Sequence, residues 1–192
     1  MSSPLTQSQL SDLRRKNARR WEANIRRQCA HLKTRGRAFV DKNWEAPLIP
    51  GTNRPRETSK PDFSGHTDTG RHVVFEAKSQ LFEETRFDFS QISEGQREQL
   101  ENAYEAGAIS FVFLLDGYGV TIRSTASADS MRRKWVIPFS EILRQENIEG
   151  NASFPYPGAR HCSDDAYIEH FKKRRGETWL DCWNRLESGG LT

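Results

Sequence analysis

An acid followed 14 residues later by an acid–amine pair is the feature of this sequence most able to do chemistry. Asp62 lies in the run KPDFSG (60–65), and Glu76 and Lys78 end the apolar run HVVFEAK (72–78). Side chains alternate between the two faces of a strand, so Glu76 and Lys78 share a face, roughly 6–7 Å apart at about 3.3 Å per residue. With a second acid from a neighbouring segment, this arrangement is that of a magnesium-dependent phosphodiesterase site.

Phosphodiester cleavage requires an activated water, neutralised charge at the phosphorus and support for the leaving oxygen. Asp62 and Glu76 are hard oxygen ligands suited to Mg²⁺, for which Mn²⁺ could substitute, and the Ala77 carbonyl could add a third oxygen. Lys78 could orient or deprotonate the water, or stabilise developing negative charge. The alternative is structural: Asp62 would be a turn residue before Gly65, and Glu76 and Lys78 a surface pair on a half-exposed strand.

Glu22 and Gln96 are two further candidate site residues, each expected on a helix. Glu22 falls at the edge of an apolar stripe, where an unpaired carboxylate is costly, so it needs either a metal ion or an arginine as partner. Gln96 shares a helix face with Leu100 and Ala103, and an inward-facing amide must be hydrogen-bonded. A metal-bound water or a ligand carboxylate would satisfy it. The alternative is a glutamine at the helix edge that reaches solvent.

The net charge of +3 conceals an uneven distribution. Residues 14–37 contain ten Lys or Arg and one acid, a net charge of +9, which leaves −6 on the rest of the chain. Such a one-sided block is typical of a surface that binds a polyanion, most often nucleic acid, although a merely soluble basic helix is the alternative. The candidate DNA-binding residues are Arg14, Arg15, Lys16, Arg19, Arg20, Arg26, Arg27, Arg54, Arg56 and Lys60.

The elements that would position these residues follow from hydrophobic periodicity. After a polar tail over 1–10, a helix over 11–34 begins near Ser11 or Asp12 and ends at Gly36. Strands are predicted over 38–48, 61–64, 72–78, 109–115 and 135–137, with a hairpin partner over 120–123 and a loop over 50–60. Helices are predicted over 91–106, capped by Ser90, over 140–144, and over 167–186 with an interruption near Gly176. This order predicts an α/β fold with a mixed sheet.

Length and composition set the remaining limits. A chain of 192 residues suits one domain with a real core. No apolar run approaches the roughly 20 residues that span a bilayer, and the N-terminus lacks a signal-peptide core, so we expect a cytoplasmic location and no membrane partner. Cys29, Cys162 and Cys182 are odd in number and far apart, which indicates reduced, structural thiols and no zinc site.

These residues resemble the PD-(D/E)XK nuclease superfamily, as Pro61-Asp62 followed by Glu76-Ala77-Lys78. The nearer likeness is to RecU-type Holliday junction resolvases, in which an Asp-aromatic-x-Gly element precedes a Phe-Glu-Ala-Lys strand, a helix with a key Gln and a further apolar strand. Here those elements are 62–65, 75–78, Gln96 and 107–111, and Glu22 corresponds to the family's N-terminal acid. The likeness covers about residues 15–125. Two departures are Gly95, where the family usually has His, and a short region before Asp62, which would reduce the family's projecting stalk.

The resemblance implies a restriction-endonuclease-like core over 1–145, with 146–192 as a C-terminal helical extension packed on the same domain. It also implies a homodimer that depends on Mg²⁺ and makes paired nicks in branched DNA during recombination and repair. Two other functions stay open at this point. One is a duplex DNA endonuclease of restriction or repair type, and the other is a non-catalytic DNA-binding protein on a nuclease fold.

Overall fold

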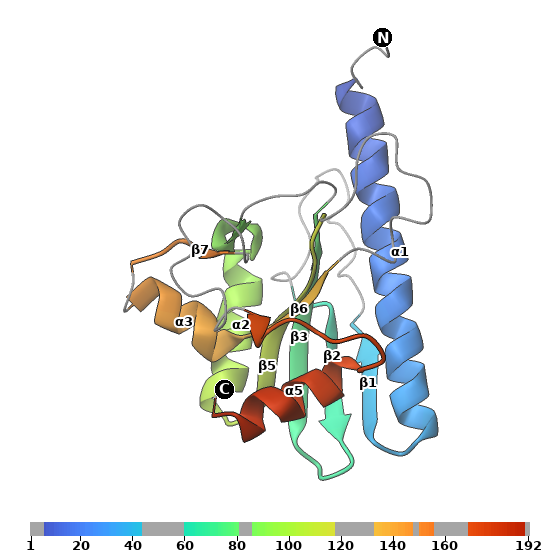
Figure 1. Ribbon diagram of the computed structural model, residues 1–192, viewed down its shortest axis with the longest axis vertical. Coiled ribbons are helices and arrows are strands. Elements are labelled where there is room, and N and C mark those ends of the chain that lie inside the picture. Colours follow the sequence, from blue (N-terminus) through green and yellow to red (C-terminus); the bar gives the residue numbers. More distant parts are fainter. Residues whose placement is uncertain are drawn as a thin grey trace, which may run out of the picture.

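A mixed β-sheet forms the centre of the protein. The computed structural model describes residues 6–43, 60–80, 86–117, 133–147, 150–155 and 169–190 (Figure 1). Within them, five strands pair in the order β1-β2-β3-β5-β6. Their bounds are β1 Ala38–Lys42, β2 Phe63–Thr67, β3 His72–Ser79, β5 Ile109–Leu115 and β6 Lys134–Pro138. β3 and β5 are parallel and the other pairs antiparallel, which confirms the predicted α/β fold with a mixed sheet.

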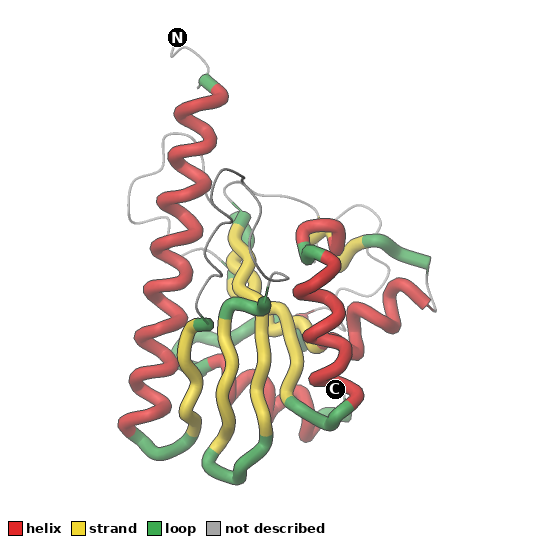
Figure 2. The backbone as a smooth tube through the Cα atoms, turned by 180° about the vertical axis from the view of Figure 1, so that it is seen from behind, coloured by secondary structure: helices red, strands yellow, loops and turns green. Residues whose placement is uncertain are grey.

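Helices cover both faces of this sheet (Figures 1 and 2). The helices α1 (Gln7–Thr34) and α5 (Trp179–Ser188) lie on one face, where Trp21 packs edge-on against Phe113 and Trp179 packs against Phe75. The helix α2 (Glu94–Glu105) lies on the other face over β3 and β5, with α3 (Phe139–Asn147) packed beside it. A short second sheet pairs β4 (Arg86–Asp88) with β7 (Ser153–Pro155).

Aromatic side chains dominate the core between the sheet and α5. Phe63, Phe75 and Phe111 stand opposite one another on β2, β3 and β5, and their rings stack at 4.9 and 4.6 Å between centroids. Trp179 and Trp183 cover this stack at 5.7 and 5.8 Å from Phe111. The i, i+4 tryptophans therefore pack in the core, and they hold α5 against the face opposite α2.

The long helix α1 begins earlier than the sequence predicts. Thr6 caps it and exchanges hydrogen bonds with Gln9 in a capping box, so residues 7–10 are helical and not a frayed tail. Four apolar residues of the predicted stripe are buried: Trp21, Ile25, Cys29 and Leu32. The fifth predicted member, Ala18, is only half-buried, and Asn17 is buried in its neighbourhood.

Two other helices begin later than predicted, because a capping box and not the apolar pattern sets the first residue of each helix. Ser93, not Ser90, caps α2, and residues 89–91 form a separate 3₁₀ turn, while Gly107 at φ 77° ends α2 as expected. The predicted helix over 167–186 was wrong for residues 171–178, which are irregular. The helix α5 starts at Trp179, directly after Thr178, which caps it in a capping box with Asp181. The strand predicted over 135–137 is confirmed as β6, and the helix predicted over 140–144 is longer at both ends.

Several predicted segments lie outside the described residues. They are residues 44–48, most of the loop over 50–60 and the hairpin partner over 120–123. Within the described part of the chain, no helix is long and apolar enough to cross a membrane.

Candidate active site

The two predicted acids meet where β2 begins beside the C-terminal half of β3. The antiparallel register sets Phe63 opposite Phe75, which brings Asp62 next to Glu76. The Asp62 backbone N–H donates to Glu76 Oε2 at 3.0 Å, and the Ala77 N–H donates to Asp62 Oδ2 at 3.1 Å. Each carboxylate is thus held by a backbone group of the neighbouring segment, which fixes the position of both.

Lys78 and Gln96 complete a closed network around Glu76. Lys78 Nζ lies 2.9 Å from Glu76 Oε1 and donates to Gln96 Oε1 at 3.3 Å. The Gln96 amide nitrogen donates to the same Glu76 oxygen at 2.8 Å. Gln96 is only 9% exposed, so it does not reach out to solvent as the alternative had it. The side chain also accepts from the Ser93 N–H at the start of α2, which ties the helix end to the site.

Burial sets the proton affinity of both acids. Glu76 is 2% exposed, and burial, followed by the charge of Asp62, raises its pKa to about 7, against the opposing effect of Lys78. Burial also raises the pKa of Asp62, and the charge of Glu22 adds to this, while the Ala77 N–H and two lysines oppose it. The folded protein therefore holds two neighbouring carboxylates in a place that disfavours their negative charge.

The donor set of this site fits a divalent cation. Two adjacent carboxylates that repel each other gain most from a positive charge placed between them. Asp62 and Glu76 supply oxygen atoms, which Mg²⁺ prefers, and Mg²⁺ is commonly held by one or two carboxylates with waters completing its shell. Among the residues described, no cluster of three or more His, Cys, Asp or Glu side chains forms a ready-made metal cage.

Glu22 lies at the side of this site but has partners of its own. Its carboxylate forms an ion pair with Lys42 of β1 and lies 3.5 Å from Arg26 one helical turn along α1. An arginine was one of the two partners that the sequence left open, and Lys42 was not foreseen. The signal for Lys42 was present, since Ala38, Val40 and Lys42 alternate onto the strand face that packs on α1.

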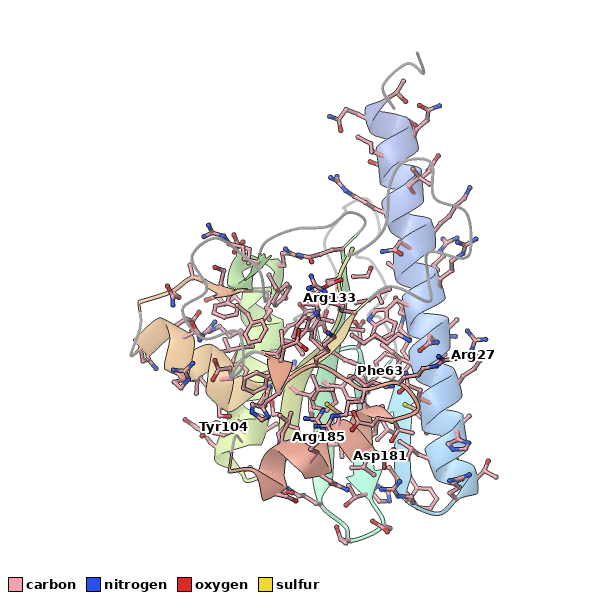
Figure 3. The ribbon with its side chains drawn as sticks, viewed as in Figure 1. Arg27, Phe63, Tyr104, Arg133, Asp181 and Arg185 are labelled. Carbon is pink, nitrogen blue, oxygen red and sulfur yellow. The ribbon has the colours of Figure 1, made fainter. Side chains whose placement is uncertain are left out.

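The predicted DNA-binding residues that the structure describes lie on the surface. The side chains on α1 are exposed: Arg14, Arg15, Lys16, Arg19, Arg20, Arg26 and Arg27. Lys60 is exposed immediately before the site, whereas Arg54 and Arg56 lie outside the described residues. The N-terminal part of α1 projects beyond the sheet (Figure 1), whereas Arg27 lies on the part of α1 beside the sheet (Figure 3).

The two cysteines that the structure describes take no part in the site. Cys29 and Cys182 are free and buried, and burial raises the pKa of Cys29 to about 11 and that of Cys182 to about 12. Thiols with such pKa values are protonated and poorly reactive at neutral pH, as expected of structural cysteines. Cys162 lies outside the described residues.

Metal binding should stabilise the folded protein in a pH-dependent way. The unfolded chain releases the Glu76 proton near its ordinary pKa of 4.5, and the folded protein only near 7, so metal-free stability falls as pH rises between these values. A cation favours the charged form. We therefore expect Mg²⁺ at about 100 times its dissociation constant to raise the melting temperature by about 5–10 °C near pH 8.

The check is thermal unfolding with Mg²⁺ and with EDTA. Near pH 5, where Glu76 keeps its proton, the shift should be much smaller. The Glu76→Gln variant should lose the shift at both pH values. An equal shift at both, or in the variant, would contradict a cation held by these carboxylates.

Comparison with known proteins supports the sequence resemblance. Residues 49–118 match the family model described as RecU, Recombination protein U. No curated protein matches the chain. Among solved structures, the chain is similar to Hjc, a Holliday junction resolvase from the archaeal hyperthermophile Archaeoglobus fulgidus, with 18% sequence identity over 63% of this chain and 76% of that one, and a TM-score of 0.35. The stretch that holds Asp62, Glu76, Lys78 and Gln96 thus matches the RecU family, which confirms the resemblance predicted from the order of these motifs.

Proposed function

We propose that this protein is a metal-dependent endonuclease that cuts branched DNA as a Holliday junction resolvase. The observation that carries the proposal is the buried Asp62–Glu76–Lys78–Gln96 network, which lies in the stretch that matches the RecU family. Asp62 and Glu76 would hold Mg²⁺, with the Ala77 carbonyl as a further oxygen and Glu22 reaching the site through water. When bound, such a cation neutralises phosphate charge and makes water a better nucleophile.

The chain's own residues supply the rest of the chemistry. The Lys78 ammonium lies 2.9 Å from Glu76. From there it can orient the attacking water and stabilise negative charge on the phosphate oxygens. Gln96 fixes the Glu76 carboxylate through its 2.8 Å hydrogen bond, so the acid keeps one orientation. The pKa of about 7 for Glu76 lets a cation or substrate set the charge state of the site.

The exposed cations of α1, with Lys60 beside the site, would contact the DNA backbone. Among the described residues, Arg14, Lys16, Arg19, Arg20 and Arg27 form no ion pair with a carboxylate. They are therefore available for sequence-independent contacts with the phosphate backbone of DNA.

Three further parts belong to the same proposal. Paired nicks in opposite strands need two sites, and each chain offers one Asp62–Glu76 pair, so the protein would act as a homodimer. The protein would act in the cytoplasm, where it would meet its DNA substrate. Residues 146–192 would extend the same domain, because Phe154, Phe171 and Trp179 are buried in one core with the sheet.

The test is cleavage of a labelled four-way junction and of a linear duplex of matched sequence. We expect symmetric nicks on the junction that appear with Mg²⁺ and vanish with EDTA. Equal cutting of both substrates would indicate a general duplex endonuclease instead. Binding of both without cutting, in Mg²⁺ and in Mn²⁺, would indicate a non-catalytic DNA-binding protein.

A further inference from the structure

Basic side chains from three separate segments meet beside β6. Arg20 and Arg27 come from α1, Lys134 begins β6, and Lys173, Arg174 and Arg175 belong to the irregular segment before α5. We call these six residues the β6–α1 basic surface. In Figure 1 the segment before α5 runs across the front of the sheet towards α1, and Figure 3 labels Arg27 on that part of α1.

Residues of this surface line two hollows. The first, of about 300 Å³, is lined by Arg20, Arg27 and Lys134 around Trp21, and the Lys134 ammonium lies 6.0 Å from the centre of the Trp21 ring. The second, of about 470 Å³, is lined by residues 169–170 and 172–175. The Lys173 N–H donates to the Lys134 carbonyl at 2.7 Å. This backbone hydrogen bond joins a residue that lines the second hollow to a residue that lines the first.

Positive charge predominates on this surface. In the described part of the chain, the side chains of Arg20, Arg27, Lys173 and Arg175 form no ion pair. The nearby acids are engaged elsewhere, since Glu169 pairs with Lys172 and Glu177 with Arg185. Burial and the charge of Lys134 lower the pKa of Lys173, and these effects outweigh the opposing charges of Glu177 and Asp181. A bound polyanion would relieve that repulsion.

The surface lies on the opposite face of the sheet from Glu76 and Lys78. Lys134 stands opposite Leu115, so its side chain shares the face of Phe113, against which Trp21 of α1 packs. Glu76 and Lys78 point to the other face, where Gln96 of α2 contacts both. A straight duplex centred on the carboxylates would follow one face. In branched DNA, a second duplex arm that departs at the branch point could follow the opposite face of the sheet.

We propose that the β6–α1 basic surface binds the phosphate backbone of a second duplex arm of branched DNA. This inference rests on the proposed function, and it assigns a role to Lys134 and to the C-terminal segment, which lie outside the RecU match. Arg20 and Arg27 are seven residues apart on one helix face, about 10 Å along the axis, so they can contact separate phosphates.

The test compares a Lys173→Ala/Arg175→Ala variant with wild type by fluorescence anisotropy in EDTA, over a range of salt concentrations. The ligands are a four-way junction and a linear duplex of the same sequence. We expect junction affinity to fall about tenfold, with the slope of log affinity against log salt smaller by about 2, one for each lost phosphate contact. Linear-duplex affinity should change less than about twofold, since that arm binds at the carboxylates.

Two further variants keep the test decisive. Arg174→Ala/Arg175→Ala changes only exposed side chains, so it replaces the first variant if Lys173→Ala unfolds the protein. Lys33→Ala/Arg35→Ala removes two exposed cations at the far end of α1 and should bind the junction like wild type. Wild-type junction affinity in the surface variants would overturn the inference, as would equal losses on both ligands. Failure of the wild type to cut the junction in any divalent metal would instead count against the nuclease proposal, because binding is measured in EDTA.

Discussion

Glu76→Gln will abolish cleavage while the protein stays folded and continues to bind DNA. The amide keeps the shape of the carboxyl group but cannot carry the negative charge that holds a cation, so the site loses about 4 kcal/mol of transition-state stabilisation, roughly a thousandfold in rate. Asp62→Asn should behave in the same way, because Asp62 is the other carboxylate of the pair. The measurement is single-turnover cutting of a labelled four-way junction in Mg²⁺.

Stability measurements separate a catalytic role from a structural one. Burial and mutual repulsion disfavour the charge of Glu76, which is why its pKa is raised to about 7. The neutral glutamine therefore removes a destabilising charge, and metal-free protein near pH 8 should unfold at the same temperature or higher. Glu98→Gln on the exposed side of α2 is the matched control and should cut at the wild-type rate. Cleavage by Glu76→Gln at the wild-type rate would end the assignment of this site.

Gly65→Ala will strongly destabilise the protein, although the position is in a regular strand. A methyl group there would collide with the Phe39 carbonyl oxygen and come within 2.7 Å of the Val40 Cα. Both are backbone atoms of β1, so no side-chain rotation can relieve the collision and β1 must move away from β2. We expect a loss of about 3 kcal/mol or more in the free energy of unfolding, measured by urea denaturation.

Gly70→Ala provides the matched control in the turn that follows β2. Gly70 has φ 80°, and a methyl group there would meet nothing within 4 Å. That variant therefore carries only backbone strain, about 1–2 kcal/mol. If Gly65→Ala were no more destabilising than Gly70→Ala, the close approach of β1 would not be the reason for the glycine in the DFSG motif.

Local patterns in the sequence were enough to predict most of the sheet and the side chains that meet around Glu76. The strands over 72–78 and 109–115 are confirmed, because period-two and apolar runs directly reflect which strand faces are buried. The same alternation placed Glu76 and Lys78 on one face, and helical spacing turned Gln96 inwards. Helix starts were less accurate, since Thr6, Ser93 and Thr178 begin helices through capping boxes that the apolar pattern does not report.

Contacts between distant segments were decided only by the tertiary structure. Alternation along β1 indicates which strand face carries Lys42, but its pairing with Glu22 follows only from the packing of α1 on that face. The contact between Lys134 and residues 172–173 likewise depends on the irregular segment before α5, which pairs with β6 at a single bridge. The sequence by itself thus determined the residue types, their faces and the order of motifs. The fold decided which charges are neighbours, since burial and long-range pairing depend on how the elements pack and not on their spacing along the chain.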